Sequence, residues 1–176
     1  MKSIPLLCIT VALLVVSCSP GNPSAKLGVP APPLRVAHWV KGKPVDLAAA
    51  RGKSVVVVEF WATWCPPCRA SIPHLSELQK RFQDRGVVMV GVSNESIEKV
   101  KPFVDQMGDQ MDYVVAIDDR DQTADAYMGA FGVDSIPHAF VVNKAGQIIW
   151  HGHPMDGLDR AIETALKGGV GSEAAK

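Results

Sequence analysis

The sequence lacks both a cluster of basic residues and a set of cysteines large enough for a disulfide-held scaffold. Its 176 residues contain 18 Lys and Arg and 18 Asp and Glu, so the net charge is zero and no nucleic-acid partner is expected. There are four cysteines, and two of them, Cys8 and Cys18, fall in an apolar N-terminal segment. A single Cys-x-x-Cys pair, Cys65 and Cys68, therefore remains for the rest of the chain.

The sequence also lacks an apolar run long enough to span a bilayer. Residues 4–16 are almost entirely apolar, but these 13 residues fall short of the roughly 20 that a membrane helix needs. Such a length suits the core of a signal peptide, and residues 15–18 resemble the lipobox at which bacteria attach a lipid to cysteine. We predict that residues 1–18 are a lipoprotein-type signal and that Cys18 carries the lipid. The alternatives are an ordinary signal peptide cut near Cys18, or an uncleaved anchor.

Composition divides the remaining chain into a tether, one domain and a tail. Residues 19–33 contain five prolines together with Gly, Ser and Asn, a composition that cannot bury a core and predicts a flexible tether. Residues 34–168 carry the hydrophobic patterns of a single domain, and 47% of the whole chain is hydrophobic, enough for an ordinary core. Residues 169–176 are predicted to be a disordered tail.

The most informative stretch joins four consecutive valines, residues 55–58, to the two remaining cysteines. The valines are typical of a buried strand. Pro66 and Pro67 stand between the cysteines, and proline is tolerated in the first turn of a helix. Cys65 is therefore predicted at a helix N-terminus, where free N–H groups and the helix dipole favour a thiolate and lower its pKa from ~8.5 to ~3.5–7.5. With Cys68 one turn further, these are the parts of a dithiol-disulfide redox site.

Strand and helix patterns alternate along the domain and predict an α/β fold with at least one parallel strand pair. A turn signal at residues 41–44 predicts two short strands forming an N-terminal hairpin. The other predicted strands are residues 87–92, 113–117, 139–142 and 147–150, and the predicted helices are residues 46–52, 66–85 and 121–131, one that opens at 93–95 and one that contains 158–166.

Residues 59–69 resemble the active-site motif of the thioredoxin superfamily, and the run Trp64-Cys65-Pro66-Pro67-Cys68 looks most like its TlpA/ResA branch. The resemblance extends over about residues 31–167. It includes Pro73 in the helix and the Ile136-Pro137 pair, which matches the family's cis-proline. It implies a thioredoxin-like fold: a central mixed β-sheet flanked by helices, with an N-terminal β-hairpin and an extra βα element at residues 95–117.

The resemblance also implies a function. The TlpA/ResA branch comprises membrane-anchored thiol-disulfide oxidoreductases of the bacterial cell envelope. We therefore expect exchange of disulfides with protein or small-molecule substrates, as a reductant and without a cofactor or metal. A membrane electron donor of the DsbD or CcdA type would restore the dithiol. The expected location is the periplasmic or extracytoplasmic face, with the lipid on Cys18 holding the domain at the membrane.

Site residues follow from the motif and the resemblance together. Cys65 is expected to attack the substrate disulfide and Cys68 to resolve the mixed disulfide. The expected substrate-binding residues are Trp64, Pro66, Pro67, Ile136 and Pro137. The Ile136–Pro137 bond is predicted to be cis and to face Cys65, the alternative being a trans proline that merely begins a strand.

Glu59 is the one charged residue of the valine-rich strand. The resemblance implies a buried acid here that relays a proton to the inner cysteine. Burial disfavours the charged form, and no lysine in residues 87–92 offsets that effect, so the pKa of Glu59 should lie above its usual value. The alternative is a carboxylate at the strand end in contact with water.

Two other functions remain open from the sequence. A thiol peroxidase of the redoxin type is compatible with the inserted βα element, although the Pro and Thr expected ahead of a single nucleophilic cysteine are missing. A copper-binding chaperone would use Cys65, Cys68 and His138. His151 and His153 could also bind copper or zinc, or simply lie at the surface.

Overall fold

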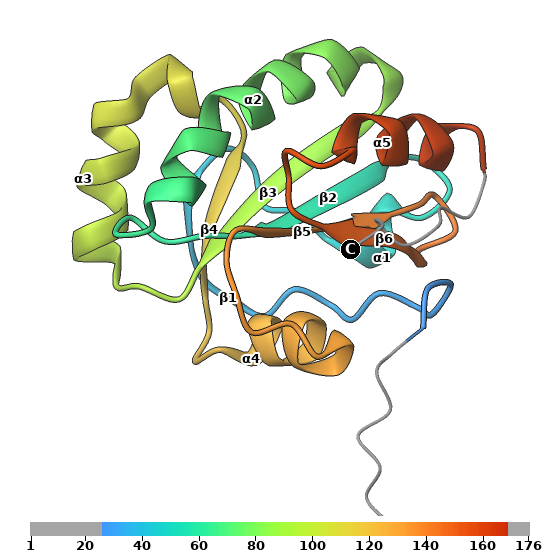
Figure 1. Cartoon of the computed structure of the whole chain (residues 1–176), viewed down its shortest axis with the longest axis horizontal. Helices are drawn as coiled ribbons and strands as arrows, with labels where there is room; N and C mark the ends of the chain where they lie inside the picture. Colours follow the sequence, from blue (N-terminus) through green and yellow to red (C-terminus); the bar gives the residue numbers. More distant parts are fainter. Residues whose placement is uncertain (1–25, 169–176) are drawn as a thin grey trace, which may run out of the picture.

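The computed structural model describes residues 26–168, which form one mixed sheet covered by helices on both faces (Figure 1). The predicted signal segment with Cys18, residues 19–25 of the predicted tether and the predicted tail lie outside the described residues. None of the helices within residues 26–168 is long and apolar enough to cross a membrane.

Six strands build the sheet in the order β1-β4-β3-β2-β5-β6. The three central strands β2, β3 and β4 run parallel, whereas β1, β5 and β6 are each antiparallel to their neighbours. This arrangement confirms the predicted mixed sheet. The strands are β1 (Val36–Lys41), β2 (Val55–Phe60), β3 (Val87–Ser93), β4 (Val114–Asp118), β5 (His138–Val142) and β6 (Ile148–Gly152).

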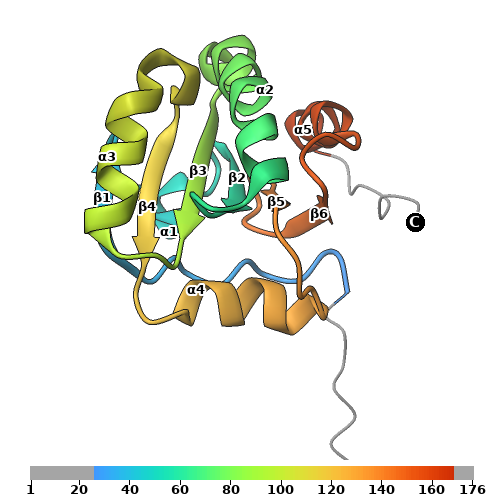
Figure 2. The same cartoon turned by 60° about the vertical axis from the view of Figure 1, so that its left-hand side comes forward.

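The helices are divided between the two faces of the sheet. α2, α3 and α5 pack on one face, and α1 and α4 pack on the other (Figures 1 and 2). The extra βα element predicted at residues 95–117 corresponds to α3 and β4, which lie between β3 and α4 in the chain. The helices are α1 (Leu47–Ala50), α2 (Pro66–Phe82) with a 3-10 turn at Gln83–Arg85, α3 (Ile97–Met107) with a 3-10 turn at Gly108–Met111, α4 (Gln122–Ala124), which continues as a π-helical turn over Asp125–Gly129, and α5 (Leu158–Leu166).

The central strand β2 is buried along its whole length. Successive side chains of a strand point to opposite faces. Val55 and Val57 accordingly join the core under α2, while Val56 and Val58 join the core on the α4 side. A strand covered on both faces reads as an unbroken apolar run, which explains the valines. The same alternation places Glu59 on the face covered by α2.

The predicted N-terminal hairpin is wrong. β1 forms its ladder with β4, from a distant part of the chain, and residues 43–46 form no second strand. Pro44 has no N–H to give to a ladder. Beyond it, Val45 packs against the core on the α4 side, and the Asp46 carboxylate accepts a hydrogen bond from the Ala48 N–H at 2.8 Å to cap α1. The turn signal therefore marks the end of one edge strand.

The predicted tether is also wrong over residues 26–33. Gly28 N–H donates to the Ile148 carbonyl at 2.7 Å, and Ile148 N–H donates back to Val29 at 2.9 Å. Val29 and Ala31 pack against the core on the α4 side. The prolines of this segment have no N–H to donate, but the remaining backbone N–H and C=O groups are enough to pair the segment with the edge of the sheet at β6. The folded domain thus begins before residue 34.

Candidate active site

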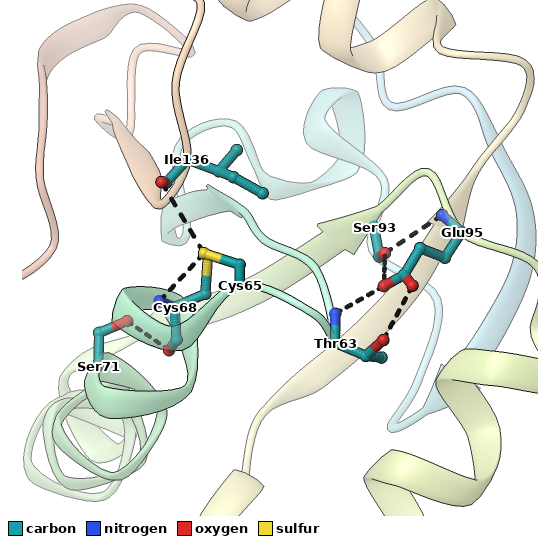
Figure 3. The surroundings of a disulfide bond; sticks show 7 residues. All are labelled: Thr63, Cys65, Cys68, Ser71, Ser93, Glu95 and Ile136. Atoms are coloured by element: carbon teal, nitrogen blue, oxygen red, sulfur yellow. Dashed lines mark hydrogen bonds between the residues drawn. A yellow bond between two sulfur atoms is a disulfide. The ribbon is translucent and has the colours of Figure 1, made fainter.

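The two cysteines lie where β2 passes into α2 and are joined by a disulfide (Figure 3). Cys65 is the N-cap residue of α2, and its Sγ accepts a hydrogen bond from the Cys68 N–H at 3.2 Å. Pro66 and Pro67 fill the first helical positions, as predicted. Cys65 is 2% exposed and Cys68 is fully buried, so a substrate can reach only Cys65.

The Ile136–Pro137 peptide bond is cis, which confirms that prediction. The segment passes directly over the disulfide, and the Ile136 carbonyl oxygen lies 3.9 Å from Cys65 Sγ (Figure 3). Pro137 is buried just ahead of β5. A backbone that is free of the sheet ladder therefore lies beside the more accessible sulfur of the pair.

A groove of about 390 Å³ opens next to the disulfide. Trp64, with 68% of its surface exposed, and Ile136 both line it. Its rim carries the exposed carboxylates of Asp125 and Asp134, and no Lys or Arg takes part in the lining. The groove thus unites two of the predicted substrate-binding residues. Pro66 and Pro67 are exposed in the first turn of α2, and the binding role of all of them stays a prediction.

Glu59 is 2% exposed, so the strand-end alternative with a water-exposed carboxylate is wrong and the predicted burial is confirmed. Neither carboxyl oxygen has a hydrogen-bond partner within the described part of the chain. Burial raises the pKa of Glu59 to about 8. A carboxyl group that is protonated near neutral pH, on the face of β2 that α2 covers, can exchange a proton with a cysteine of that helix.

A second acid, Glu95, holds the loop that leads into Cys65. Its carboxylate accepts hydrogen bonds from the Thr63 N–H at 2.6 Å and from the Thr63 hydroxyl at 2.8 Å (Figure 3). The sequence pattern placed Glu95 in the opening of a helix, but α3 begins only at Ile97. Because 32 residues separate Thr63 from Glu95, no local signal could have revealed this contact.

His138 does not join the cysteines. Its Nε2 lies 2.9 Å from Nδ1 of His151, and its ring packs against Phe140 on the α4 side of the sheet. Burial, and then the nearby His151 and His153, lower the pKa of His138 to about 4. Within residues 26–168, no three His, Cys, Asp or Glu side chains gather in a metal-binding arrangement. The arrangement of ligands expected for the copper chaperone is therefore not formed by these residues.

A profile described as the AhpC/TSA family matches residues 27–151. The chain belongs to the AhpC/TSA family. Among curated proteins it is similar to the thiol-disulfide oxidoreductase ResA of Bacillus thuringiensis (strain Al Hakam), with 32% identity over 111 residues, 62% of this chain and 60% of that protein. ResA of Bacillus subtilis (strain 168) is 32% identical over 130 residues, 73% of this chain and 68% of that protein. The chain spans about 60% of the length of the first of these relatives.

Solved structures place this AhpC/TSA chain among thioredoxin-like folds. A thiol:disulfide interchange protein of the thioredoxin family from Chlorobium tepidum TLS superposes with a TM-score of 0.65 at 32% identity, covering 81% of this chain and 99% of that one. The predicted thioredoxin-like α/β fold is thereby confirmed. The region that matches the AhpC/TSA family, residues 27–151, includes both the disulfide-bearing stretch and the cis-proline.

Proposed function

We propose that the protein is a thiol-disulfide oxidoreductase that reduces disulfides of other proteins in the bacterial cell envelope. The observation that carries this proposal is the Cys65–Cys68 disulfide at the N-terminus of α2, with the Ile136 carbonyl beside Cys65. The helix N-terminus stabilises a thiolate on Cys65 once the pair is reduced. Similarity to proteins named ResA supports the same activity.

The reaction begins with the reduced dithiol. The Cys65 thiolate attacks one sulfur of a substrate disulfide, forming a bond between Cys65 and that sulfur while the substrate S–S bond breaks. The second substrate sulfur leaves as a thiolate and takes a proton from water. At this point the protein and the substrate are joined through a mixed disulfide.

The buried cysteine then releases the substrate. With a pKa of about 8, Glu59 reaches its ionised form as a minor species near neutral pH. In that form its carboxylate takes the proton of Cys68, and the resulting thiolate attacks Cys65. The Cys65–Cys68 bond forms, and the remaining substrate sulfur leaves as a thiolate. The substrate has gained two electrons and the protein has lost two, which returns the pair to the disulfide that the structure contains.

The groove supplies the substrate site in this proposal. An extended segment of the substrate lies along the chain at Ile136, whose free backbone groups offer hydrogen bonds in the manner of an added strand. Trp64 covers apolar side chains of that segment. Disulfides of proteins fit this site better than compact small molecules, because the binding contacts extend well beyond the two sulfurs.

Purified protein tests the activity and its direction. We expect the reduced form to reduce the disulfides of insulin, and the oxidised form to be a poor oxidant of reduced, unfolded ribonuclease. The reverse result would make the protein an oxidase, since potentials of this fold range from about −270 to about −120 mV. Faster turnover of hydrogen peroxide than of insulin would favour the thiol peroxidase, and tight binding of copper by an inactive dithiol would favour the chaperone.

We further propose that Cys18 carries a lipid and that the domain works at the extracytoplasmic face, re-reduced by a membrane protein of the DsbD or CcdA type. The apolar residues 4–16 and the run before Cys18 support this proposal. Cys18→Ala should move the protein from the membrane fraction to the soluble fraction or leave it unprocessed, whereas Cys8→Ala should not. If Cys18→Ala fractionates like the wild type, the anchor is of another kind.

A further inference from the structure

Unpartnered buried polar atoms in the described part of the chain are confined to one place. Four such side-chain atoms occur: both carboxyl oxygens of Glu59, Nε1 of Trp61 and the hydroxyl of Tyr113. A buried donor or acceptor without a partner costs free energy, and native proteins keep few of them. Two donors and two acceptors left unpaired in the same region therefore call for a functional reason.

All three side chains meet around Gly91. Trp61 directly follows β2, and its N–H still donates to the Val92 carbonyl of β3 at 3.2 Å, so its side chain continues the alternation and shares the face of Glu59. Glu59 itself stands directly opposite Gly91 of β3. A Cβ on Gly91 would come within 3.0 Å of Cε2 of Tyr113 and 3.1 Å of Nε1 of Trp61. Glycine at this position thus lets the phenol and the indole approach the strand pair that carries Glu59.

We infer that the Tyr113 hydroxyl and the Trp61 indole N–H are positioning groups that hold the ionised Glu59 carboxylate during the resolving step. The inference rests on the proposed function, in which Glu59 takes the proton of Cys68. An indole N–H can only donate, and a phenol can donate, whereas an ionised carboxylate only accepts. The two orphan donors therefore match the charged form of Glu59, which in the absence of donors would be strongly disfavoured by burial.

Among residues 26–168, burial alone shifts the pKa of Glu59, so no other described charge acts on its carboxyl group. Gly91 of β3 and Ala139 of β5 are its neighbours in the sheet, and α2 turns Cys68 and Ile72 onto this face. Of these, only the Cys68 thiol can titrate, and only when the disulfide is reduced. The pKa of Tyr113 is raised well above its usual value, first by burial and then by the charge of Glu59, as expected for two groups within electrostatic reach.

The test uses Tyr113→Phe, which removes one hydroxyl and leaves the ring in place. The Glu59 titration is followed in the oxidised protein by carbon-13 NMR, and its signal is assigned with Glu59→Gln. We expect the Glu59 midpoint to move up by about one pH unit, because the charged form has lost a donor. The pH midpoint of the resolving step, measured by release of substrate from the mixed disulfide, should move by the same amount.

Tyr127→Phe is the matched control. Tyr127 is also a buried tyrosine but lies on the opposite face of the sheet, and its hydroxyl donates to the Pro32 carbonyl at 2.7 Å. It should lower stability and leave the Glu59 midpoint unchanged. An unchanged midpoint in Tyr113→Phe, or an equal change in both variants, would overturn the inference.

The two readouts separate this inference from the proposed function. The NMR titration needs neither a substrate nor reduced cysteines. If wild-type protein exchanges no disulfides while Tyr113→Phe still raises the Glu59 midpoint, the proposed function fails and the pairing of donors with Glu59 stands. If exchange is normal and the midpoint does not move, only the inference fails.

Discussion

Replacing Cys65 by serine should lower the rate of insulin reduction by at least ~10³-fold, the scale on which loss of an essential nucleophile acts. Cys65 is the N-cap of α2, beside the Ile136 carbonyl, whereas Cys68 is fully buried behind it. A serine hydroxyl at the same place does not attack a disulfide, because exchange requires a thiolate. The measurement is the initial rate of insulin reduction with a chemical reductant in excess.

Ser76→Ala is a suitable control for Cys65→Ser. Ser76 is also a buried residue of α2, but its hydroxyl donates to the Gln110 carbonyl at 2.7 Å, away from the cysteines. It should keep its activity within a few-fold of wild type. Cys65→Ser protein that retains a tenth or more of the wild-type rate would show that the nucleophile lies elsewhere.

Replacing Glu59 by glutamine should stabilise the oxidised protein near neutral pH. The unfolded chain ionises this carboxyl with a pKa near 4.5, but burial in the folded protein raises the pKa to about 8. Between these values the folded state keeps a proton that the unfolded state has lost, so the free energy of unfolding of the wild type falls as pH rises. The glutamine variant has no such proton and should be more stable at pH 7 by about 3 kcal/mol.

Denaturant unfolding at several pH values checks this sign. The stability difference between Glu59→Gln and wild type should be small at pH 4 and should grow by about 1.4 kcal/mol per pH unit towards pH 8. Glu77→Gln, at an exposed position of α2, should change stability by no more than about 0.5 kcal/mol at any pH. A difference that does not depend on pH would contradict the raised pKa of Glu59.

The same substitution should slow catalysis while it stabilises the fold. Glutamine fills the space of glutamate but cannot take the Cys68 proton, and general acid-base groups typically contribute about 10²–10⁴-fold. We expect release of the substrate from the mixed disulfide to slow much more than the first attack by Cys65. A buried functional residue is expected to lower the stability of the fold while it raises the rate of the reaction, and the Glu59 carboxyl should show both effects.

Local sequence patterns predicted the centre of the domain well. Four consecutive valines are typical of a strand covered on both faces, and two prolines between Cys65 and Cys68 are tolerated at a helix start, as the structure has them. The burial of Glu59 followed from the family resemblance, because the strand pattern alone left a water-exposed carboxylate open. The cis bond before Pro137 came from the family resemblance, because the sequence around it would equally suit a trans proline.

Contacts between distant segments could not be predicted in the same way. The turn signal after β1 suggested a hairpin, but the choice of β4 as the partner of β1 depends on the whole sheet. The bonds from Thr63 to Glu95, and the approach of Tyr113 to Gly91, join residues with no common local pattern. Each of these contacts arises when the parallel strands β2, β3 and β4 come together, which periodicity along the chain does not encode.

The most direct test of the account is to trap the mixed disulfide. Cys68→Ser protein is incubated with a disulfide-containing substrate such as insulin, free thiols are blocked, and the adduct is located by mass spectrometry of peptides. We predict an abundant adduct on Cys65, because the step that normally releases the substrate has been removed, and little adduct in Cys65→Ser protein. Equal trapping by both variants, or an abundant adduct on Cys68 in Cys65→Ser protein, would contradict the assignment of Cys65 as the attacking cysteine.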